Sequence, residues 1–169
     1  MSLDAKLVNL AEQVLAENRA LGRRVAVAES CTGGLVAAAL TEVAGCSDVF
    51  ERGFVTYSNE AKMESLGVGE DIIATFGAVS IAVAWAMAQG ALAHSHADVA
   101  VAITGIAGPG GGSDKKPVGT VVFARAERNG DPSQVVADVK SFGDLGRSEV
   151  RRQAALVALG LLRPGAVAP

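Results

Sequence analysis

The chain has few of the residues that mark several common classes of protein. Of its 169 residues, only 4% are aromatic, and only Cys31 and Cys46 are cysteine. Two cysteines cannot make the disulfide framework of a small secreted domain, so no such framework is expected. No basic and apolar leader with a cleavage site opens the sequence. We therefore expect a reducing, cytoplasmic location.

Long hydrophobic runs and a strong net charge are also missing. The longest apolar stretch, residues 81–93, is shorter than the roughly 20 residues that a membrane helix needs, so we expect no membrane association. A net charge of −3 gives no electrostatic reason to expect nucleic-acid binding. The arginines at 147, 151 and 152 form only a local patch in the last predicted helix.

What the chain does have is small apolar side chains. Half of its residues are hydrophobic, and many of these are alanine and valine. A chain of this length can bury the core of one domain. Small side chains suit close helix packing, either inside the domain or between the subunits of a homo-oligomer, which we expect.

Helical and strand patterns alternate along the chain. We predict a first helix over residues 2–21, with Ser2 as its N-cap and Gly22 after its end. The other predicted helices are 33–43, 59–66 with Asn59 as a candidate cap, 80–93 and 149–162. The predicted strands are 25–28, 50–57, 98–103, 119–126 and 135–142.

This alternation indicates an α/β fold. The Asn-Gly-Asp-Pro turn at 129–132 predicts that the last two strands form an antiparallel hairpin. We therefore predict a single domain over residues 1–169, a three-layer α/β/α sandwich on a mixed sheet, with a frayed tail at 164–169.

Residues 28–34, Ala-Glu-Ser-Cys-Thr-Gly-Gly, stand between a predicted buried strand and a predicted helix. Backbone N–H groups at a helix start lack intrahelical partners, so Ser30 is placed either to cap the helix or to act as a nucleophile. As a nucleophile, it would form an oxyanion beside the N–H groups of residues 32–34. From spacing alone, a cap is the commoner role. Cys31 is a second candidate nucleophile, although small buried cysteines are usually inert.

Two more segments are expected at the same end of the sheet. Residues 57–62 supply Tyr57 and Lys62, and residues 104–112 form a glycine-rich turn whose N–H groups can approach a phosphate. Neither His94 nor His96 is placed to serve Ser30, which leaves a Ser–Lys pair. Lysine acts as a base only if its pKa falls from about 10.4 toward neutrality.

Each of these features also has an ordinary structural explanation. Lys62 can be a solvated helix residue, Tyr57 a residue at a sheet edge, and the glycine-rich turn a plain connection. That turn is neither a Walker loop nor a dinucleotide fingerprint. The His-Ser-His segment at 94–96 is a weak metal signal, and we expect no metal site.

Taken together, five ordered segments closely resemble the CinA C-terminal domain family. This is the family of bacterial nicotinamide-nucleotide amidohydrolases, or NMN deamidases. The segments are 28–34, 57–62, 77–80, 104–111 and 116–120, and the resemblance runs from about residue 5 to residue 162. It implies hydrolysis of the carboxamide of nicotinamide mononucleotide (NMN) to nicotinate mononucleotide and ammonia. It also implies a serine amidase of pyridine-nucleotide salvage, with neither metal nor cofactor.

The same resemblance implies roles for individual residues. Ser30 matches the nucleophile and Lys62 the general base, and Tyr57 joins them in the catalytic group. The implied substrate-binding residues are Thr32, Gly33, Gly34, Asn59, Thr104, Gly105, Ala107, Gly108, Gly110, Gly111, Arg147 and Arg151. Many relatives read Gly-Asp-Arg near the C-terminus. Here two residues separate Gly143-Asp144 from Arg147, so the path of Arg147 to a substrate phosphate is left to the structure.

Two other functions stay open at this point. The chain can be a serine amidase or esterase with another substrate, or a non-catalytic nucleotide-binding module, since relatives are linked by name to DNA-uptake competence. The acidic net charge argues against direct contact with DNA.

Overall fold

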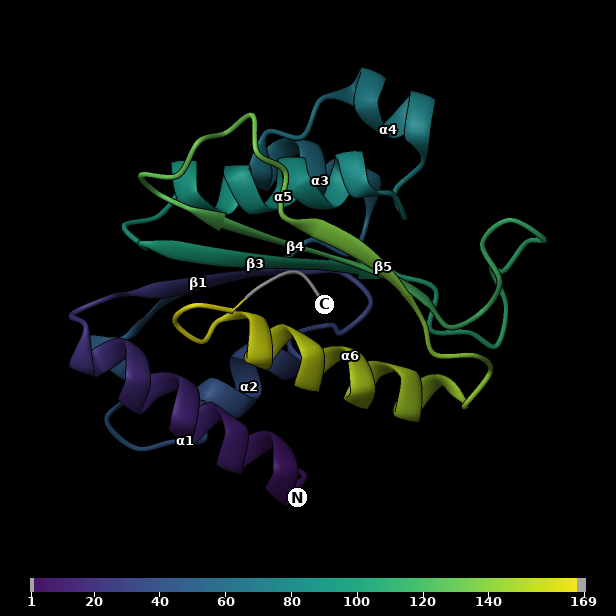
Figure 1. Cartoon of the computed structure of the whole chain (residues 1–169). Helices are drawn as coiled ribbons and strands as arrows, with labels where there is room; N and C mark the ends of the chain where they lie inside the picture. Colours follow the sequence, from purple (N-terminus) through teal and green to yellow (C-terminus); the bar gives the residue numbers. More distant parts are fainter. Residues whose placement is uncertain (1, 167–169) are drawn as a thin grey trace.

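The computed structural model describes residues 2–166. Figure 1 shows one sheet between two layers of helices. The helices are α1 (Ala5–Ala20), α2 (Leu35–Thr41), α3 (Asn59–Leu66), α4 (Glu70–Phe76), α5 (Ile81–Ala93) and α6 (Arg147–Leu161), with a short 3-10 helix η1 (Cys46–Asp48). The strands are β1 (Val25–Glu29), β2 (Phe50–Val55), β3 (Val99–Gly105), β4 (Thr120–Glu127) and β5 (Ala137–Ser141).

The sheet is mixed, as predicted. Its strand order is β2-β1-β3-β4-β5. β1 runs parallel to both β2 and β3, whereas β4 is antiparallel to β3 and to β5. β4 and β5 form the predicted hairpin. The carboxyl ends of β1, β2 and β3 therefore meet at one edge of the sheet, where a crevice can form.

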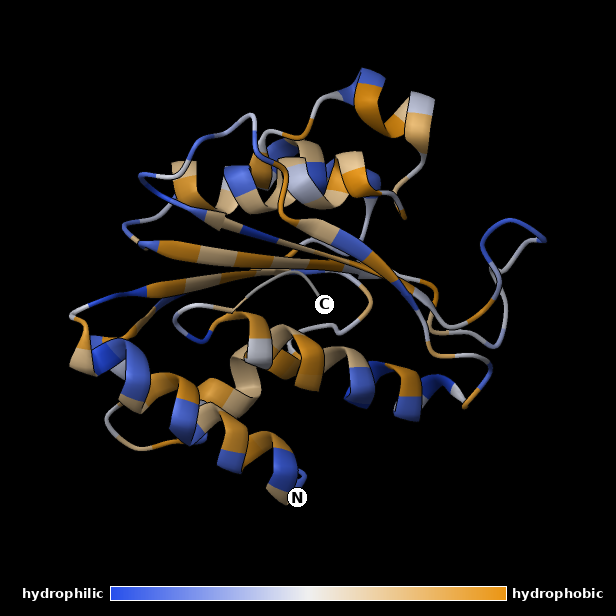
Figure 2. Cartoon of the chain, in the orientation of Figure 1, coloured by the Kyte–Doolittle hydropathy of each residue, from blue (hydrophilic) through white to orange (hydrophobic). Residues whose placement is uncertain are grey.

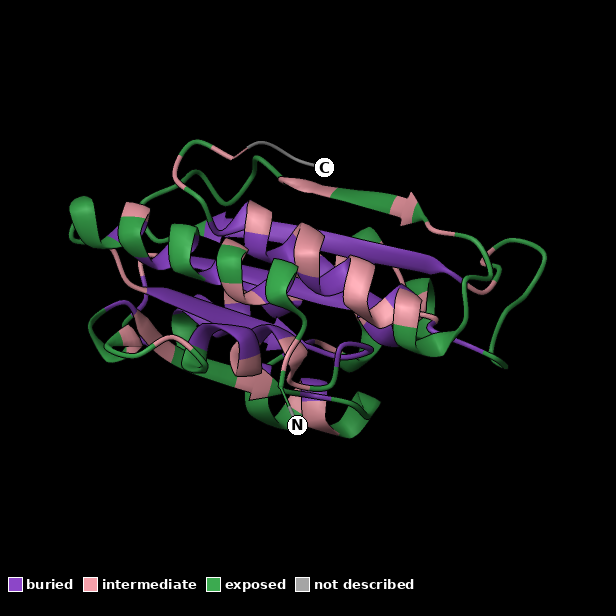
Figure 3. Ribbon diagram, turned by 90° about the horizontal axis from the view of Figure 1, so that it is seen from below, coloured by how far each residue is buried: buried purple, intermediate pink, exposed green. Residues whose placement is uncertain are grey.

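The two faces of the sheet bury side chains of different size. Valines and larger residues of the inner strands face α1, α2 and α6, whereas alanines such as Ala26, Ala100 and Ala102 face α5. The inner strands β1 and β3 are mainly hydrophobic, whereas hydrophobic and hydrophilic residues alternate along α1 and α6 (Figure 2). Seen from below, the inner strands are buried, and β5 at the border is half-buried to exposed (Figure 3). Small residues between α5 and the sheet bring that helix close.

Two predicted helix caps were wrong, although the predicted bounds of α3, residues 59–66, are confirmed. Asp4, and not Ser2, caps α1, because its carboxylate accepts the N–H groups of Lys6 and Leu7. Ser58, and not Asn59, caps α3. Both corrections follow from the side-chain oxygen that reaches the free N–H groups of the first turn.

Other differences concern helix length and elements without a sequence signal. α2 begins two residues later than predicted, because Gly33 and Gly34 adopt left-handed φ angles of 58° and 98°. α4 and η1 were not predicted. Of the predicted frayed tail, residues 167–169 lie outside the described residues. No helix in the described part of the chain is long and apolar enough to cross a membrane.

Gly90 sets how closely α3 approaches α5. A Cβ at Gly90 would collide with the carbonyl oxygen of Leu66 and lie 2.9 Å from its carbonyl carbon, at the end of α3. A Cβ at Gly160 in α6 meets nothing within 4 Å. Packing therefore requires a glycine at position 90 but not at position 160.

We predict opposite effects of alanine at these two glycines. Gly90→Ala lowers the free energy of unfolding by about 1–3 kcal/mol, because α5 must move away from the backbone at the end of α3. Gly160→Ala raises it by up to about 1 kcal/mol, because alanine is the better helix former. Urea unfolding followed by circular dichroism measures both changes. A stabilised Gly90→Ala protein would show that α3 does not pack as described.

Candidate active site

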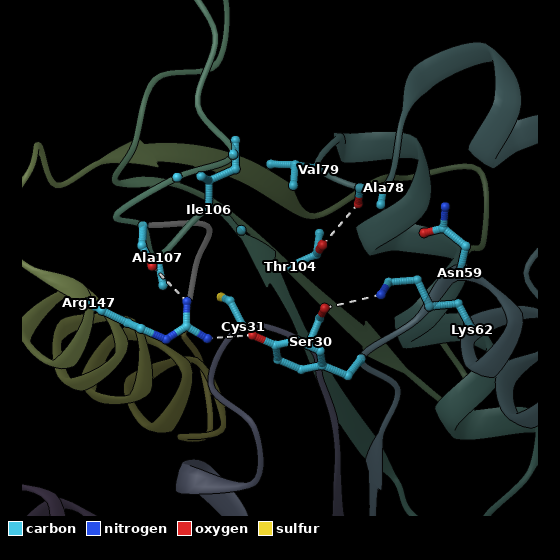
Figure 4. Close-up of a pocket in the computed structure, with 15 residues that line it drawn as sticks. Ser30, Cys31, Asn59, Lys62, Ala78, Val79, Thr104, Ile106, Ala107 and Arg147 are labelled. Carbon is cyan, nitrogen blue, oxygen red and sulfur yellow. Dashed lines mark hydrogen bonds between the residues drawn. The ribbon is translucent and has the colours of Figure 1, made fainter.

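The edge where β1, β2 and β3 end holds a cavity of about 260 Å³ (Figure 4). It is bounded by the residues that follow β1 and β2, by the segment before α5, by the turn after β3 and by the start of α6. Its lining residues are Ser30, Cys31, Tyr57, Asn59, Lys62, Ala78, Val79, Thr104, Gly105, Ile106, Ala107, Gly108, Gly110, Gly111 and Arg147.

Ser30 and Lys62 meet inside this cavity. Ser30 directly follows β1, and its N–H donates to the carbonyl of Ile103 on β3. Lys62 reaches it from α3, with its Nζ 3.1 Å from the Ser30 Oγ (Figure 4). The same Nζ donates to the Thr56 carbonyl at 2.8 Å. Lys62 is 1% exposed, so the solvated lysine considered above is excluded.

Burial changes the acidity of this amine. Loss of water around Lys62 lowers the pKa of its ammonium group, and the nearby Cys31 acts weakly in the opposite direction. Desolvation is the larger cause because an ammonium is stabilised far better by water than by an apolar wall. The uncharged amine, the form that can accept a proton, is therefore favoured relative to a solvated lysine.

Two charged side chains hold the turn that carries Ser30. The Glu29 carboxylate, fully buried, accepts the N–H groups of Val36 and Ala37 at 2.9 and 3.1 Å. Arg151 donates to the carbonyls of Cys31 and Thr32 at 3.2 and 3.0 Å. The turn is thus tied to α2 through Glu29 and to α6 through Arg151.

These contacts correct the expected source of free N–H groups. The Gly33 N–H already donates to the Ser30 carbonyl at 3.0 Å, and the first N–H groups of α2 go to Thr32 and Glu29. Within residues 2–166, the N–H groups of Cys31, Thr32 and Gly34 have no hydrogen-bond acceptor in another residue. Any N–H donors for an oxyanion near Ser30 are therefore these, rather than the start of the helix proper.

Arg147 crosses the cavity from α6 to the opposite wall. It donates to the Gly108 carbonyl at 2.7 Å and to the Tyr57 hydroxyl at 2.6 Å. Arg147 therefore reaches the cavity even though Leu145 and Gly146 separate it from Gly143-Asp144. Thr104 closes another part of the wall, since its hydroxyl donates to the Ala78 carbonyl at 2.9 Å (Figure 4).

The structure brings together most, but not all, of the predicted site residues. Eleven line the cavity: Ser30, Tyr57, Asn59, Lys62, Thr104, Gly105, Ala107, Gly108, Gly110, Gly111 and Arg147. Four do not: Thr32, Gly33, Gly34 and Arg151. Arg151 lies behind the Ser30 turn and binds its carbonyls.

Some lining residues had no assigned role from the sequence. Ala78, Val79 and Ile106 are small or apolar and carry no chemical signal, although 77–80 was one of the five recognised segments. Of the two histidines, His94 contacts the carbonyl of Gly90 in its own helix. In the part of the chain that the structure describes, no three His, Cys, Asp or Glu side chains gather as metal ligands.

Comparison with known proteins identifies the family of this chain. Residues 7–165 match the family described as the CinA C-terminal domain. The chain belongs to this family. It is 52% identical over 160 residues to "Nicotinamide-nucleotide amidohydrolase PncC" of Escherichia coli K12, covering 94% of each chain.

Two further members show the range of names within the CinA family. A crystal structure titled "competence/damage inducible protein CihA" from Agrobacterium tumefaciens is 52% identical, with a TM-score of 0.91 over 96% of this chain and 97% of that one. A "Putative competence-damage inducible protein" of Symbiobacterium thermophilum is 51% identical over 148 residues, which are 84% of this chain but 34% of the relative.

The two cysteines of this CinA-family chain are predicted to differ in reactivity. Both are free thiols. Cys31 is buried, and burial raises the pKa of its thiol to about 11. Since only the thiolate reacts, Cys31 should be alkylated slowly near pH 8, whereas the half-buried Cys46 should be alkylated faster. Iodoacetamide labelling followed by peptide mass spectrometry measures both rates. Faster labelling of Cys31 would contradict this description and revive it as a nucleophile.

Proposed function

We propose that this protein hydrolyses the carboxamide of NMN with Ser30 as nucleophile and Lys62 as general base. The observation that carries the proposal is the buried Lys62 amine, 3.1 Å from the Ser30 hydroxyl at the cavity wall. The substrate is suggested by the name of the 52% identical relative, a nicotinamide-nucleotide amidohydrolase. We assign the reaction to pyridine-nucleotide salvage in the cytoplasm.

The first half of the reaction forms an ester on Ser30. The Lys62 amine takes the hydroxyl proton, and the Ser30 Oγ bonds to the carboxamide carbon. The C=O electron pair moves to oxygen and gives a tetrahedral oxyanion. Lys62, now an ammonium, returns its proton to the amide nitrogen. The oxyanion electron pair then re-forms the C=O bond as the C–N bond breaks, so ammonia leaves and an acyl-serine remains.

The oxyanion needs hydrogen-bond donors in place before it forms. The N–H groups of Cys31, Thr32 and Gly34, which have no acceptor in another residue within residues 2–166, are the candidates. One such donor is typically worth about 3–4 kcal/mol of the barrier. Glu29 and Arg151 keep the turn rigid, so little reorganisation is required when the charge develops.

The second half of the reaction releases the product. Lys62 takes a proton from water, and the resulting hydroxide oxygen bonds to the acyl carbon. The bond between the acyl carbon and the Ser30 Oγ then breaks, and Lys62 passes the proton to Oγ. The carboxylic acid product releases its proton to solvent and leaves as nicotinate mononucleotide, and both side chains return to their starting protonation states. The pyridinium charge of NMN withdraws electrons from its carboxamide, which makes this substrate easier to attack than a neutral amide.

The rest of the cavity suits a nucleotide attached to a nicotinamide ring. The exposed ring of Tyr57 offers a π face to the pyridinium cation, and Thr104 offers a hydroxyl. The turn at 108–111 and the Arg147 guanidinium offer donors to the phosphate. Arg147 would exchange its contacts with Gly108 and Tyr57 for phosphate oxygens, because charge-assisted bonds are the stronger ones.

The decisive test removes each member of the pair in turn. Ser30→Ala and Lys62→Met should each lower the rate of ammonia release from NMN by about 10³-fold or more, since both act on the same bond-making step. Ammonia is measured with purified protein by a coupled assay, and nicotinate mononucleotide by chromatography. Circular dichroism shows whether the fold is kept.

Two exposed residues supply matched controls. Ser65 lies on α3 beside Lys62, and Lys6 lies on α1 across the sheet. Ser65→Ala and Lys6→Met should keep the parent rate. Folded Ser30→Ala or Lys62→Met protein with full activity would remove the mechanism. An inactive parent that still binds NMN in calorimetry would favour a non-catalytic nucleotide-binding protein.

A further inference from the structure

The border of the sheet next to β5 carries an exposed apolar patch. Of the eight large apolar side chains exposed within residues 2–166, four line one groove of about 670 Å³. They are Phe76, Ile81, Val135 and Val139, which are 54%, 41%, 51% and 45% exposed. Scattered apolar side chains are ordinary on a protein surface, whereas a contiguous group marks a surface that is covered. We call these four residues the β5 patch.

β5 also has backbone groups at this border that pair with no second strand within residues 2–166. It is the last strand in the sheet order, so β4 is the one strand of the described chain that pairs with it (Figure 1). The Arg125 N–H donates to the Val136 carbonyl at 2.8 Å, and antiparallel pairs alternate in which residues share such bonds. The N–H and C=O groups of Ala137, Val139 and Ser141 therefore point away from β4. An edge of this kind is a template for another strand.

The charges on β5 select one partner and one register. If two copies of β5 pair antiparallel about a two-fold axis at Val139, Asp138 lies opposite the partner's Lys140, and Lys140 opposite the partner's Asp138. Moving the axis to Asp138 opposes two aspartates, and moving it to Lys140 opposes two lysines. Opposite charges across a pair of strands stabilise it, and like charges destabilise it. The strand is thus complementary to itself in a single register.

We propose that two copies of this chain associate through β5, joining their sheets about a two-fold axis at Val139. The outward groups of Val139 bond to those of the partner's Val139, and Ala137 pairs with the partner's Ser141. In the single chain the Asp138 carboxylate accepts the Val139 N–H at 2.8 Å. On pairing, this N–H passes to the partner's backbone, and Asp138 turns to the partner's Lys140. The hydrogen bond from the Val139 N–H to the Asp138 carboxylate is thus replaced by one to the partner's backbone, and the N–H stays paired.

The proposed interface touches the wall of the active site. Val79 lines both the groove of the β5 patch and the Ser30 cavity. Its neighbour Ala78 accepts the Thr104 hydroxyl at the cavity wall. Phe76 and Ile81, two members of the patch, stand on either side of this segment. Covering the patch therefore restrains residues 77–80, although no side chain of the second copy needs to enter the cavity.

A charge exchange tests the proposal. Sedimentation equilibrium should show a dimer of the parent protein at micromolar concentrations. Asp138→Lys and Lys140→Asp should each weaken the dimer at least tenfold, because each places like charges opposite one another. The double variant Asp138→Lys, Lys140→Asp restores opposite charges and should restore the dimer. Glu12→Lys, an exposed charge reversal on α1, should leave it unchanged.

The outcomes separate clearly. A parent that stays monomeric overturns the proposal, as does a dimer that both single variants leave intact. A double variant that remains as weak as the single ones also overturns it, because the effect would then not come from paired charges. If one single variant fails to fold by circular dichroism, the other single variant with the double variant decides the matter.

Discussion

The structure depends on an amine that is kept away from water. Lys62 is buried against Ser30 and the Thr56 carbonyl. Its ammonium form would be more stable in water than at this buried position. This arrangement costs folding free energy, and the rest of the site makes it possible. Ser58 starts α3 at the correct turn, and Gly90 lets α3 lie against α5. As a result of this burial, the pKa of Lys62 is lowered toward the range in which an amine can act as a base.

Two charged side chains also fix the turn at residues 30–34. Glu29 and Arg151 are opposite charges on the two sides of residues 30–34, and each binds backbone groups rather than the other. A buried carboxylate is stable when N–H groups satisfy it, so Glu29 fixes α2 relative to β1. Within residues 2–166, the N–H groups of Cys31, Thr32 and Gly34 have no acceptor in another residue. The site is thus built from backbone donors that side chains keep in position.

Sequence patterns predicted the layers, the mixed sheet and the hairpin because hydrophobic periodicity and turn residues act locally. The Ser30–Lys62 pair was predicted by segment order and family resemblance, and the structure brings the two side chains together. Caps at Asp4 and Ser58 were missed because neighbouring polar residues compete for the same role. Thr56 was beyond prediction because it acts through its backbone carbonyl. Arg151 was predicted as a substrate-binding residue, but it binds the carbonyls of Cys31 and Thr32, 120 and 119 positions away in the sequence. Gly33 was predicted as a free donor and proved to be occupied.

The state of the Lys62 amine is the most direct test of this account. Protein labelled with carbon-13 at the lysine ε position can be titrated by nuclear magnetic resonance, with Lys62→Met used to assign the signal. The account predicts that Lys62 loses its proton at a lower pH than a solvated lysine, whose reference pKa is about 10.4. A Lys62 signal that titrates at or above that reference value would contradict the account, because a charged lysine at neutral pH could not take the proton of Ser30.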